Sequence, residues 1–411
     1  MTTLSTDVPS AFALTQWSFG FYRRAQLGCG FLSIVFLFVL CVAGHDVLAQ
    51  SQKNATRQQQ QQQQALQKQF NDGALMILAG HPGTSYFTMA RDIAAAFAEN
   101  NELRLLPIDA GGGTENIRSL LYLRGVDMAL VPSNALAQAN ASSMFGTNLS
   151  QRLTYITQLY SDEVHVLVRP DIRSFEQLRG LKIAVPPQDG NSEFTFRDLL
   201  QRNRMEVDVV RMAVPDAIDE VRSGGAIAGL VLTGAKPLRV LASLPKDGSL
   251  RLLAMPPLQG DGYTPAAFRS DDYPTLIPDG QTVDTVSFNT VLATNNTPKW
   301  DDSHRRVSKF VPAFFSVLSE LAGPQHHPKW SDVNLAVTLD GWSRFDAAEA
   351  WLAKAQQEQA ALVRKNFEQF LSATRGPGTP ALSPNAQREL FEEFMQWSRR
   401  SVGTPKQVSR P

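Results

Sequence analysis

The sequence predicts an α/β protein whose folded part consists of two lobes, and three observations support this prediction. A chain of 411 residues, 43% of them hydrophobic, is long enough to bury more than one ordinary core. Short apolar runs typical of buried strands lead into turns and then into amphipathic helical patterns. The alternation occurs in two successive series, which indicates a mostly parallel sheet flanked by helices in each lobe.

The N-terminal region contains an apolar segment that predicts export across a membrane. Arg23 and Arg24 precede an uncharged stretch, 25–45, as in the basic and apolar regions of a signal peptide. Small residues up to Ala49 offer a cleavage site. Because the stretch is also long enough to span a bilayer, residues 1–49 are expected to be either a cleaved signal peptide or a retained membrane anchor.

Composition excludes several classes of function. The 39 basic residues balance the 39 acidic ones, so no net charge favours nucleic acid as a partner. The only cysteines, Cys29 and Cys41, lie in the apolar segment, so a mature domain would have no thiol nucleophile and no disulfide. Residues 50–72 are rich in glutamine and are expected to be a disordered linker, serving either as a spacer or having no role.

Strand-to-helix units define both lobes. In the first lobe, the predicted strands are 75–79, 103–108 and 128–131. In the second lobe and beyond it, the predicted elements are strands 182–185, 207–212, 226–232 and 285–293 and helices 216–222, 304–321 and 346–370, with a last helix that begins near Ser383. A Pro/Gly/Asp-rich stretch, 256–280, separates the third of these later strands from the fourth.

The turns that follow the first-lobe strands are candidate anion sites. They place helix N-termini at the carboxyl edge of the sheet, where backbone N–H groups favour carboxylate or phosphate. The glycines at 111–113 could equally serve only to permit a tight turn.

No motif for catalysis, a cofactor or a metal stands out. Neither Gly-x-Gly-x-x-Gly nor a P-loop is present, and the nucleophile elbow of serine hydrolases is missing. His326 and His327 are adjacent and so point in different directions, without supporting ligand spacing. We therefore expect no enzyme activity, no cofactor and no metal site.

Five motifs occur in a characteristic order along about residues 75–325. They are 78–86 (LAGHPGTSY), 109–117 (DAGGGTENI), 126–134 (VDMALVPSN), 160–169 (YSDEVHVLVR) and 175–188 (FEQLRGLKIAVPPQ). This series resembles the TAXI solute receptors, the extracytoplasmic binding subunits of a branch of the TRAP transporters.

The resemblance implies a two-lobed type II periplasmic binding protein fold with crossing hinge strands and extra C-terminal helices. The crossings would be 164–169 and 283–290, and closure about this hinge would trap a ligand. The expected division is a signal peptide or anchor at 1–49, a linker at 50–72, a first lobe of 73–168 plus 285–325, a second lobe of 169–284 and a C-terminal helical extension at 326–411.

The resemblance also implies which residues face the ligand cleft. Those carried over are His81, Thr84, Ser85, Tyr86, Gly113, Thr114, Glu115, Ser133, Asn134, Asn191, Ser192 and Thr233. Several depart from the family pattern: His81 and Pro82 replace a glycine-rich original, and Asn134 replaces an acid. These changes keep the backbone turns and alter the side chains offered to a ligand. Arg169 could bind a ligand carboxylate or form a structural salt bridge.

Together these features predict a periplasmic protein that captures a small carboxylate or amino acid for TRAP-type permease subunits. The same fold would serve a binding protein of an ABC importer. A membrane-anchored periplasmic sensor or scaffold is the other alternative, motivated by the apolar segment and the glutamine-rich linker.

Overall fold

The computed structural model divides the chain into two compact units, Met1–Phe70 and Asn71–Pro411. The residues that it describes are 53–68, 71, 73–100, 102–187, 190–374, 383, 385–386 and 388–394. The expected signal peptide or anchor at 1–49 lies outside these residues. None of the helices among the described residues is long and apolar enough to cross a membrane.

The glutamine-rich segment differs from the expected disordered linker, because residues 53–68 form one helix. All of its side chains are exposed, so the helix buries no core of its own. Glutamine loses little side-chain freedom in a helix, which explains how a segment without an apolar face can still adopt this structure.

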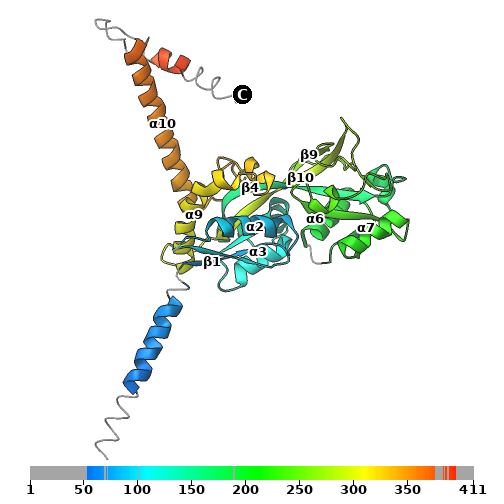
Figure 1. Cartoon of the computed structure of the whole chain (residues 1–411), viewed down its shortest axis with the longest axis horizontal. Coiled ribbons are helices and arrows are strands. Elements are labelled where there is room, and N and C mark those ends of the chain that lie inside the picture. Colours follow the sequence, from blue (N-terminus) through cyan, green and yellow to red (C-terminus); the bar gives the residue numbers. More distant parts are fainter. Residues whose placement is uncertain are drawn as a thin grey trace, which may run out of the picture. The chain divides into compact units, whose positions relative to one another are not determined.

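A ten-stranded mixed sheet forms the centre of the second unit (Figure 1). Eight strands follow the order β2-β1-β3-β10-β4-β7-β5-β6, while β8 pairs with β4 and β9 with β10. The strands are β1 Ala74–Leu78, β2 Arg104–Ile108, β3 Met128–Pro132, β4 Leu153–Val168, β5 Lys182–Val185, β6 Asp208–Arg211, β7 Ile227–Gly234, β8 Arg251–Leu252, β9 Tyr263–Arg269 and β10 Thr282–Asn295.

Helices cover both faces of this sheet. They are α2 Ser85–Ala96, α3 Gly113–Tyr122, α4 Ser133–Ala141, α5 Leu149–Arg152, α6 Gly190–Arg202, α7 Val214–Ser223, α8 Arg239–Ala242, α9 Asp302–Leu321 and α10 Asp346–Thr374, with 3-10 turns η1 Phe175–Leu178 and η2 Pro328–Asp332. Local sequence explains their starts. Thr84 caps α2 with its side chain, Asp301 caps α9, and Pro215 occupies the first turn of α7, where its missing N–H costs nothing.

Two long strands join the lobes. The first lobe contains the parallel strands β1, β2 and β3, and the second contains the parallel strands β5, β6 and β7. Residues 153–163 of β4 pair with β10, and residues 163–168 pair with β7. In β10, residues 282–288 pair with β9 and residues 290–294 pair with β3. Both strands therefore cross from one lobe to the other, as the predicted fold class requires (Figure 1).

Four hydrophobic clusters pack against the sheet, two in each lobe. In the first lobe, α2 and α9 cover one face, while α3 and α4 cover the other. In the second lobe, α6 and α7 contribute to separate clusters. Each lobe therefore has its own core. Ends of strands and helices face the space between the lobes.

Part of the expected C-terminal extension packs inside the first lobe. Trp330 is 2% exposed and belongs to the same cluster as Phe310, and Phe345 joins them. The backbone N–H of Phe345 donates a hydrogen bond of 2.8 Å to the carbonyl oxygen of Tyr155 in β4. The segment around η2 therefore completes the first lobe, and α10 continues from it.

Candidate functional site

A cleft of about 400 Å³ lies at the carboxyl ends of the parallel strands and is lined by both lobes. The first lobe contributes the turn 81–85 between β1 and α2. The second lobe contributes residues that follow β5 and β6, together with the end of β7 and the segment after it. Ligands of open α/β sheets bind at this edge, and the volume suits a small molecule.

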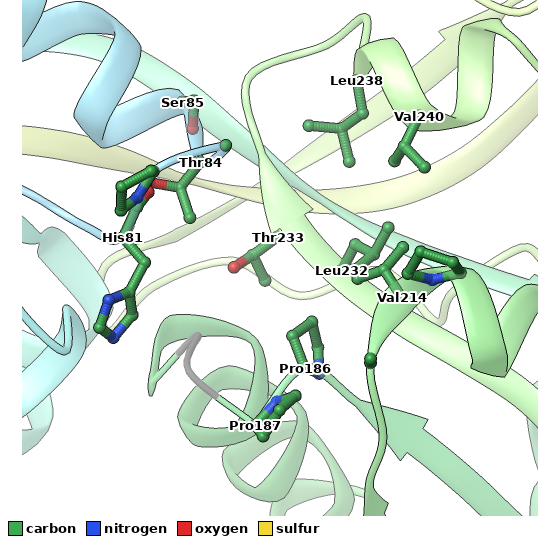
Figure 2. A pocket seen from close by; sticks show the side chains of 14 residues that line it. His81, Thr84, Ser85, Pro186, Pro187, Val214, Leu232, Thr233, Leu238 and Val240 are labelled. Carbon is green, nitrogen blue, oxygen red and sulfur yellow. The ribbon is translucent and has the colours of Figure 1, made fainter.

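The two walls of the cleft differ in chemistry. Figure 2 shows His81, Thr84 and Ser85 on the first-lobe wall, with Thr233 between the walls. The second-lobe wall carries the apolar side chains of Pro186, Pro187, Val214, Leu232, Leu238 and Val240. A solute in this cleft would meet hydroxyl and imidazole groups at one side and hydrocarbon at the other.

The polar wall is built on the turn that starts α2. The Thr84 hydroxyl donates to the carbonyl oxygen of His81 at 2.7 Å and accepts the N–H of Phe87 at 3.3 Å. A Cβ atom on Gly80 would lie only 2.6 Å from this hydroxyl oxygen, so glycine is needed there. The imidazole of His81 pairs with the carboxylate of Asp109, which follows β2. The turn is thereby held in one conformation beside the N-terminus of α2.

A second, smaller cavity of about 10 Å³ adjoins the cleft and shares His81, Thr84, Ser85 and Thr233 with it. It has room for about one water molecule. Gly111, Gly112 and Asn191 lie around it, next to the N-termini of α3 and α6. The positive ends of three helix dipoles, α2, α3 and α6, therefore lie around this part of the cleft.

Asp162 of β4 lines the smaller cavity and is 1% exposed. Its carboxylate accepts hydrogen bonds from the Ser85 hydroxyl at 3.1 Å and from the Thr290 hydroxyl at 2.7 Å. Burial raises the pKa of Asp162 to about 7 despite these two hydrogen bonds, and the charge of neighbouring Glu163 acts in the same direction as burial. A carboxyl group that titrates near neutral pH thus lies at the polar end of the cleft.

The lobes touch beside this cavity. The N–H of Gly190, at the start of α6, donates to the carbonyl oxygen of Gly111 at 3.0 Å. A Cβ atom on Gly190 would overlap that oxygen, and one on Gly112 would lie 3.0 Å from Oδ1 of Asn191. Gly190 and Gly112 therefore allow the two backbones to meet on this side of the cleft.

Another set of contacts joins the lobes at the start of α4. The Asn134 amide donates to the Tyr263 hydroxyl at 2.9 Å, and that hydroxyl donates to Asp198 of α6 at 2.8 Å. The Ser133 hydroxyl donates to the carbonyl oxygen of Gly262 at 2.8 Å. The chain itself thus occupies the N-terminus of α4, so Ser133 and Asn134 line neither cavity.

The remaining sequence-predicted site residues divide between the cavities and their surroundings. Tyr86 and Asn191 line the smaller cavity, while Gly113 lies next to Asn191. The Ser192 hydroxyl accepts the N–H of Thr233 at 2.8 Å and so holds the backbone of a residue that lines the cleft. Glu115 instead forms an exposed ion pair with Arg118 on α3.

Some residues stand apart from the cleft. Thr114 lines neither cavity. Arg169 also lines neither; its guanidinium contacts Asp171 at 3.4 Å and the carbonyl oxygen of Gly225 at 3.3 Å. No group of three or more potential metal ligands occurs in the described part of the chain.

Sequence reasoning missed Asp162 and the apolar wall. Asp162 belongs to the quoted motif 160–169, where an acidic residue in a buried strand was the available signal. The apolar wall gave no such signal, because its residues come from four separate segments.

Comparisons with known proteins place these features in a family context. The sequence profile described as the NMT1-like family matches residues 77–327, a range that contains both crossing strands and every residue that lines the cleft. Comparison with curated protein sequences gives no match.

Solved structures also resemble the chain at low identity. The periplasmic binding protein BugD is 13% identical, with a TM-score of 0.42 over 71% of this chain and 97% of that one. A substrate-binding protein of an amino acid ABC transporter is 16% identical, with a TM-score of 0.37 over 63% and 98%. A TctC solute-binding protein from Polaromonas is 15% identical, with a TM-score of 0.36 over 60% and 88%.

Proposed function

The chain belongs to the NMT1-like family of periplasmic binding proteins, and on that premise we propose that it captures a small anionic or zwitterionic solute for a TRAP-type transporter. The observation that carries the proposal is the cleft between the lobes, about 400 Å³ in volume. Its position at the carboxyl ends of the strands is where a ligand gains most from helix N-termini.

The electrostatics of the polar wall support an anionic group on the solute. α2, α3 and α6 begin beside the smaller cavity, and each is at least ten residues long. Backbone N–H groups in the first turn of such helices stabilise a carboxylate without a cationic side chain. The hydroxyl groups of Thr84, Ser85 and Thr233 line the same part of the cleft, and those of Thr84 and Ser85 already donate to the carbonyl oxygen of His81 and to Asp162.

The crossing strands support hinge closure as the binding motion. β4 and β10 connect the lobes, and their register shifts between Asn289 and Val291 and again between Leu292 and Ala293. Such irregularities bend a strand locally and increase its twist, so they suit a hinge. The solute would then be enclosed when the lobes approach.

A thermal-shift screen of the purified full-length protein against carboxylates and amino acids tests the proposal. A ligand that binds only the folded state raises the melting temperature, and the stabilisation grows by about 1.4 kcal/mol for each tenfold excess over Kd. We expect at least one compound to raise it. A saturating panel that leaves it unchanged would refute a role in solute capture.

The transporter class needs its own test, because TRAP assignment rests on the resemblance of the five motifs. Cross-linking in the native membrane followed by purification should recover permease subunits without an ATPase. Recovery of an ATPase-linked permease would instead identify the protein as part of an ABC importer.

Export and the fate of the N-terminus are part of the same proposal. The uncharged stretch 25–45 and the small residues before Gln50 support secretion with cleavage after Ala49. Mass measurement of the protein from the periplasm is expected to give a chain that starts at Gln50. A chain that keeps residues 1–49 and stays with the membrane would favour an anchored receptor, sensor or scaffold.

A further inference from the structure

The segment after β7 forms part of the second-lobe wall, and the backbone of Leu238 anchors it. Leu238 and Val240 line the cleft from this segment, and Val240 belongs to the short helix α8 (Figure 2). The N–H of Leu238 donates to the Tyr273 hydroxyl at 2.8 Å. The carbonyl oxygen of Leu238 accepts the N–H groups of Leu241 and Ala242, at the start of α8. The position of Leu238 therefore sets where α8 and Val240 lie.

Tyr273 connects this wall to the crossing strand β4. It comes from the turn-rich stretch between β9 and β10 and is completely buried. Its hydroxyl lies 2.7 Å from Nε2 of His165, a residue of β4 that is also completely buried. The other ring nitrogen of His165, Nδ1, lies 3.0 Å from the carbonyl oxygen of Glu163. Because a carbonyl oxygen can only accept, Nδ1 carries the hydrogen, and Nε2 accepts one from the Tyr273 hydroxyl.

These hydrogen bonds form one directed chain from the cleft wall to β4. Leu238 donates to Tyr273, Tyr273 donates to His165, and His165 donates to the backbone of β4. Burial lowers the pKa of His165 to about 3, so at neutral pH the ring is uncharged and keeps one nitrogen as an acceptor. Phe268 stacks on this ring with 4.4 Å between the centroids. Each buried polar group of the chain has its partner, so the loss of one group would leave another unsatisfied.

We propose that His165 and Tyr273 are positioning residues of the solute site, which fix the wall formed by Leu238 and Val240 without contacting the solute. Neither positioning residue lines the cleft or the smaller cavity. A solute that packs on this wall binds more tightly when the wall is already held in place, because less conformational freedom is then lost on binding. The inference rests on the proposed function, since it requires that the cleft holds a solute.

Hydrogen exchange of the full-length protein, measured by mass spectrometry, tests how the wall is held without any ligand. Tyr273→Phe removes only the hydroxyl that accepts the N–H of Leu238, so exchange in the peptide 235–242 should become at least about tenfold faster at that amide. Tyr155→Phe is the matched control, because the Tyr155 hydroxyl accepts the N–H of Leu339 at 3.3 Å and lines neither cavity. This control should leave exchange in 235–242 unchanged. Unchanged exchange in Tyr273→Phe would overturn the inference.

A second pair of variants separates positioning from stability. His165→Phe keeps an aromatic ring against Phe268 but leaves the Tyr273 hydroxyl without its acceptor, so it should lower the urea midpoint. Adding Tyr273→Phe removes that hydroxyl and should restore at least about half of the lost midpoint, since apolar groups of similar shape can replace a hydrogen-bonded pair at little cost. Solute affinity should not recover with the midpoint, because the N–H of Leu238 still lacks its acceptor in the double variant.

Isothermal titration calorimetry measures that affinity with the carboxylate or amino acid that raises the melting temperature most in the screen. Tyr273→Phe and the double variant should each bind this compound at least about fivefold more weakly than the wild-type protein, and Tyr155→Phe should bind it equally well. Affinity that recovers together with the urea midpoint, or that falls equally in Tyr155→Phe, would overturn the inference while the protein remained a solute receptor. If no compound of the panel binds the wild-type protein, the proposed function falls and this inference with it.

Discussion

Asp162 and Glu163 are consecutive acidic residues of β4, and both are almost fully buried. Asp162 lines the smaller cavity, whereas Glu163 accepts hydrogen bonds from the Lys329 ammonium at 2.6 Å and from the N–H of Lys236 at 3.0 Å. Burial raises the pKa of both carboxyl groups, and Lys329 opposes this effect most strongly at Glu163. The protein thus keeps one buried acid in an ion pair and places the other, equally buried, in the wall of the smaller cavity.

Asp162→Asn is expected to change how stability depends on pH. The folded state holds the Asp162 proton up to about pH 7, whereas the unfolded state releases it near about pH 4, so the wild-type protein loses stability as pH rises between these values. Asparagine removes this loss. Urea denaturation should show the variant gaining up to about 4 kcal/mol relative to the wild type between pH 4 and pH 7. Parallel curves for the two proteins would contradict the assignment.

Lys329→Met should destabilise the fold at neutral pH by about 3–5 kcal/mol, because it leaves Glu163 as a buried charge without its cation. Adding Glu163→Gln to this variant removes the charge and should recover most of the loss. Denaturant midpoints of the two single variants and the double variant measure the coupling. If the double variant lost as much free energy of unfolding as the two single variants together, Lys329 and Glu163 would not be coupled.

The sequence could predict some cleft residues better than others. Thr84 and Ser85 follow a strand and start a helix, so turn chemistry alone places them at the sheet edge. Ser133 and Asn134 have the same local pattern, but the loop at Gly262 covers their helix start. The two residues of that contact are 129 positions apart in the chain, so the local sequence around Ser133 could not predict it.

At the scale of elements, α6 approaches the turn after β2 closely, since the N–H of Gly190 donates to the carbonyl oxygen of Gly111 at 3.0 Å. Gly190→Ala places a methyl group against the carbonyl oxygen of Gly111. We expect this variant to bind solute at least about tenfold more weakly, because closure would lose the contact that depends on the glycine.

Gly111→Ala is the matched comparison for this variant. A Cβ atom there would meet only Glu115, at an ordinary distance of 3.5 Å. Small-angle scattering with and without ligand should therefore show compaction for Gly111→Ala and none for Gly190→Ala. Equal compaction of both variants would contradict the role of Gly190.

Most strands and helices were predictable because their apolar periodicity is local. Strand 182–185 agrees with β5, and helix 304–321 agrees with α9 within two residues. The first half of β4 was not predicted, since Thr154, Thr157 and Gln158 look polar although neighbouring strands bury them. β9, within the turn-rich stretch 256–280, was missed because its pairing with β10 is a tertiary contact.

At the scale of the whole molecule, the structure distinguishes two parts of the C-terminal region. Residues up to Trp351 pack on the first lobe, where the Trp351 ring meets Phe315 at 5.1 Å. Farther along α10, Phe367 packs instead on Phe391 in the helical segment 388–394. The second part is therefore stabilised mainly by its own contacts.

Two truncations test this distinction. Removal of residues 355–411 should change the melting temperature of the solute-binding unit by less than about 4 °C, because the core clusters stay intact. Removal of residues 326–411 takes away Trp330 and Lys329 and should prevent folding. Circular dichroism gives the melting temperature of each shortened protein. A stable protein without residues 326–411 would contradict the packing described above.

The position of Trp330 has an optical consequence. Its indole is 2% exposed and donates to Asp92 at 2.8 Å, and it neighbours Lys329 in the chain. Lys329 in turn pairs with Glu163, the strand neighbour of Asp162 at the cleft. Indole emission responds to the local electric field, so a solute that changes the charge of Asp162 should alter the fluorescence of Trp330. The protein would then carry a built-in spectroscopic reporter of its own occupancy.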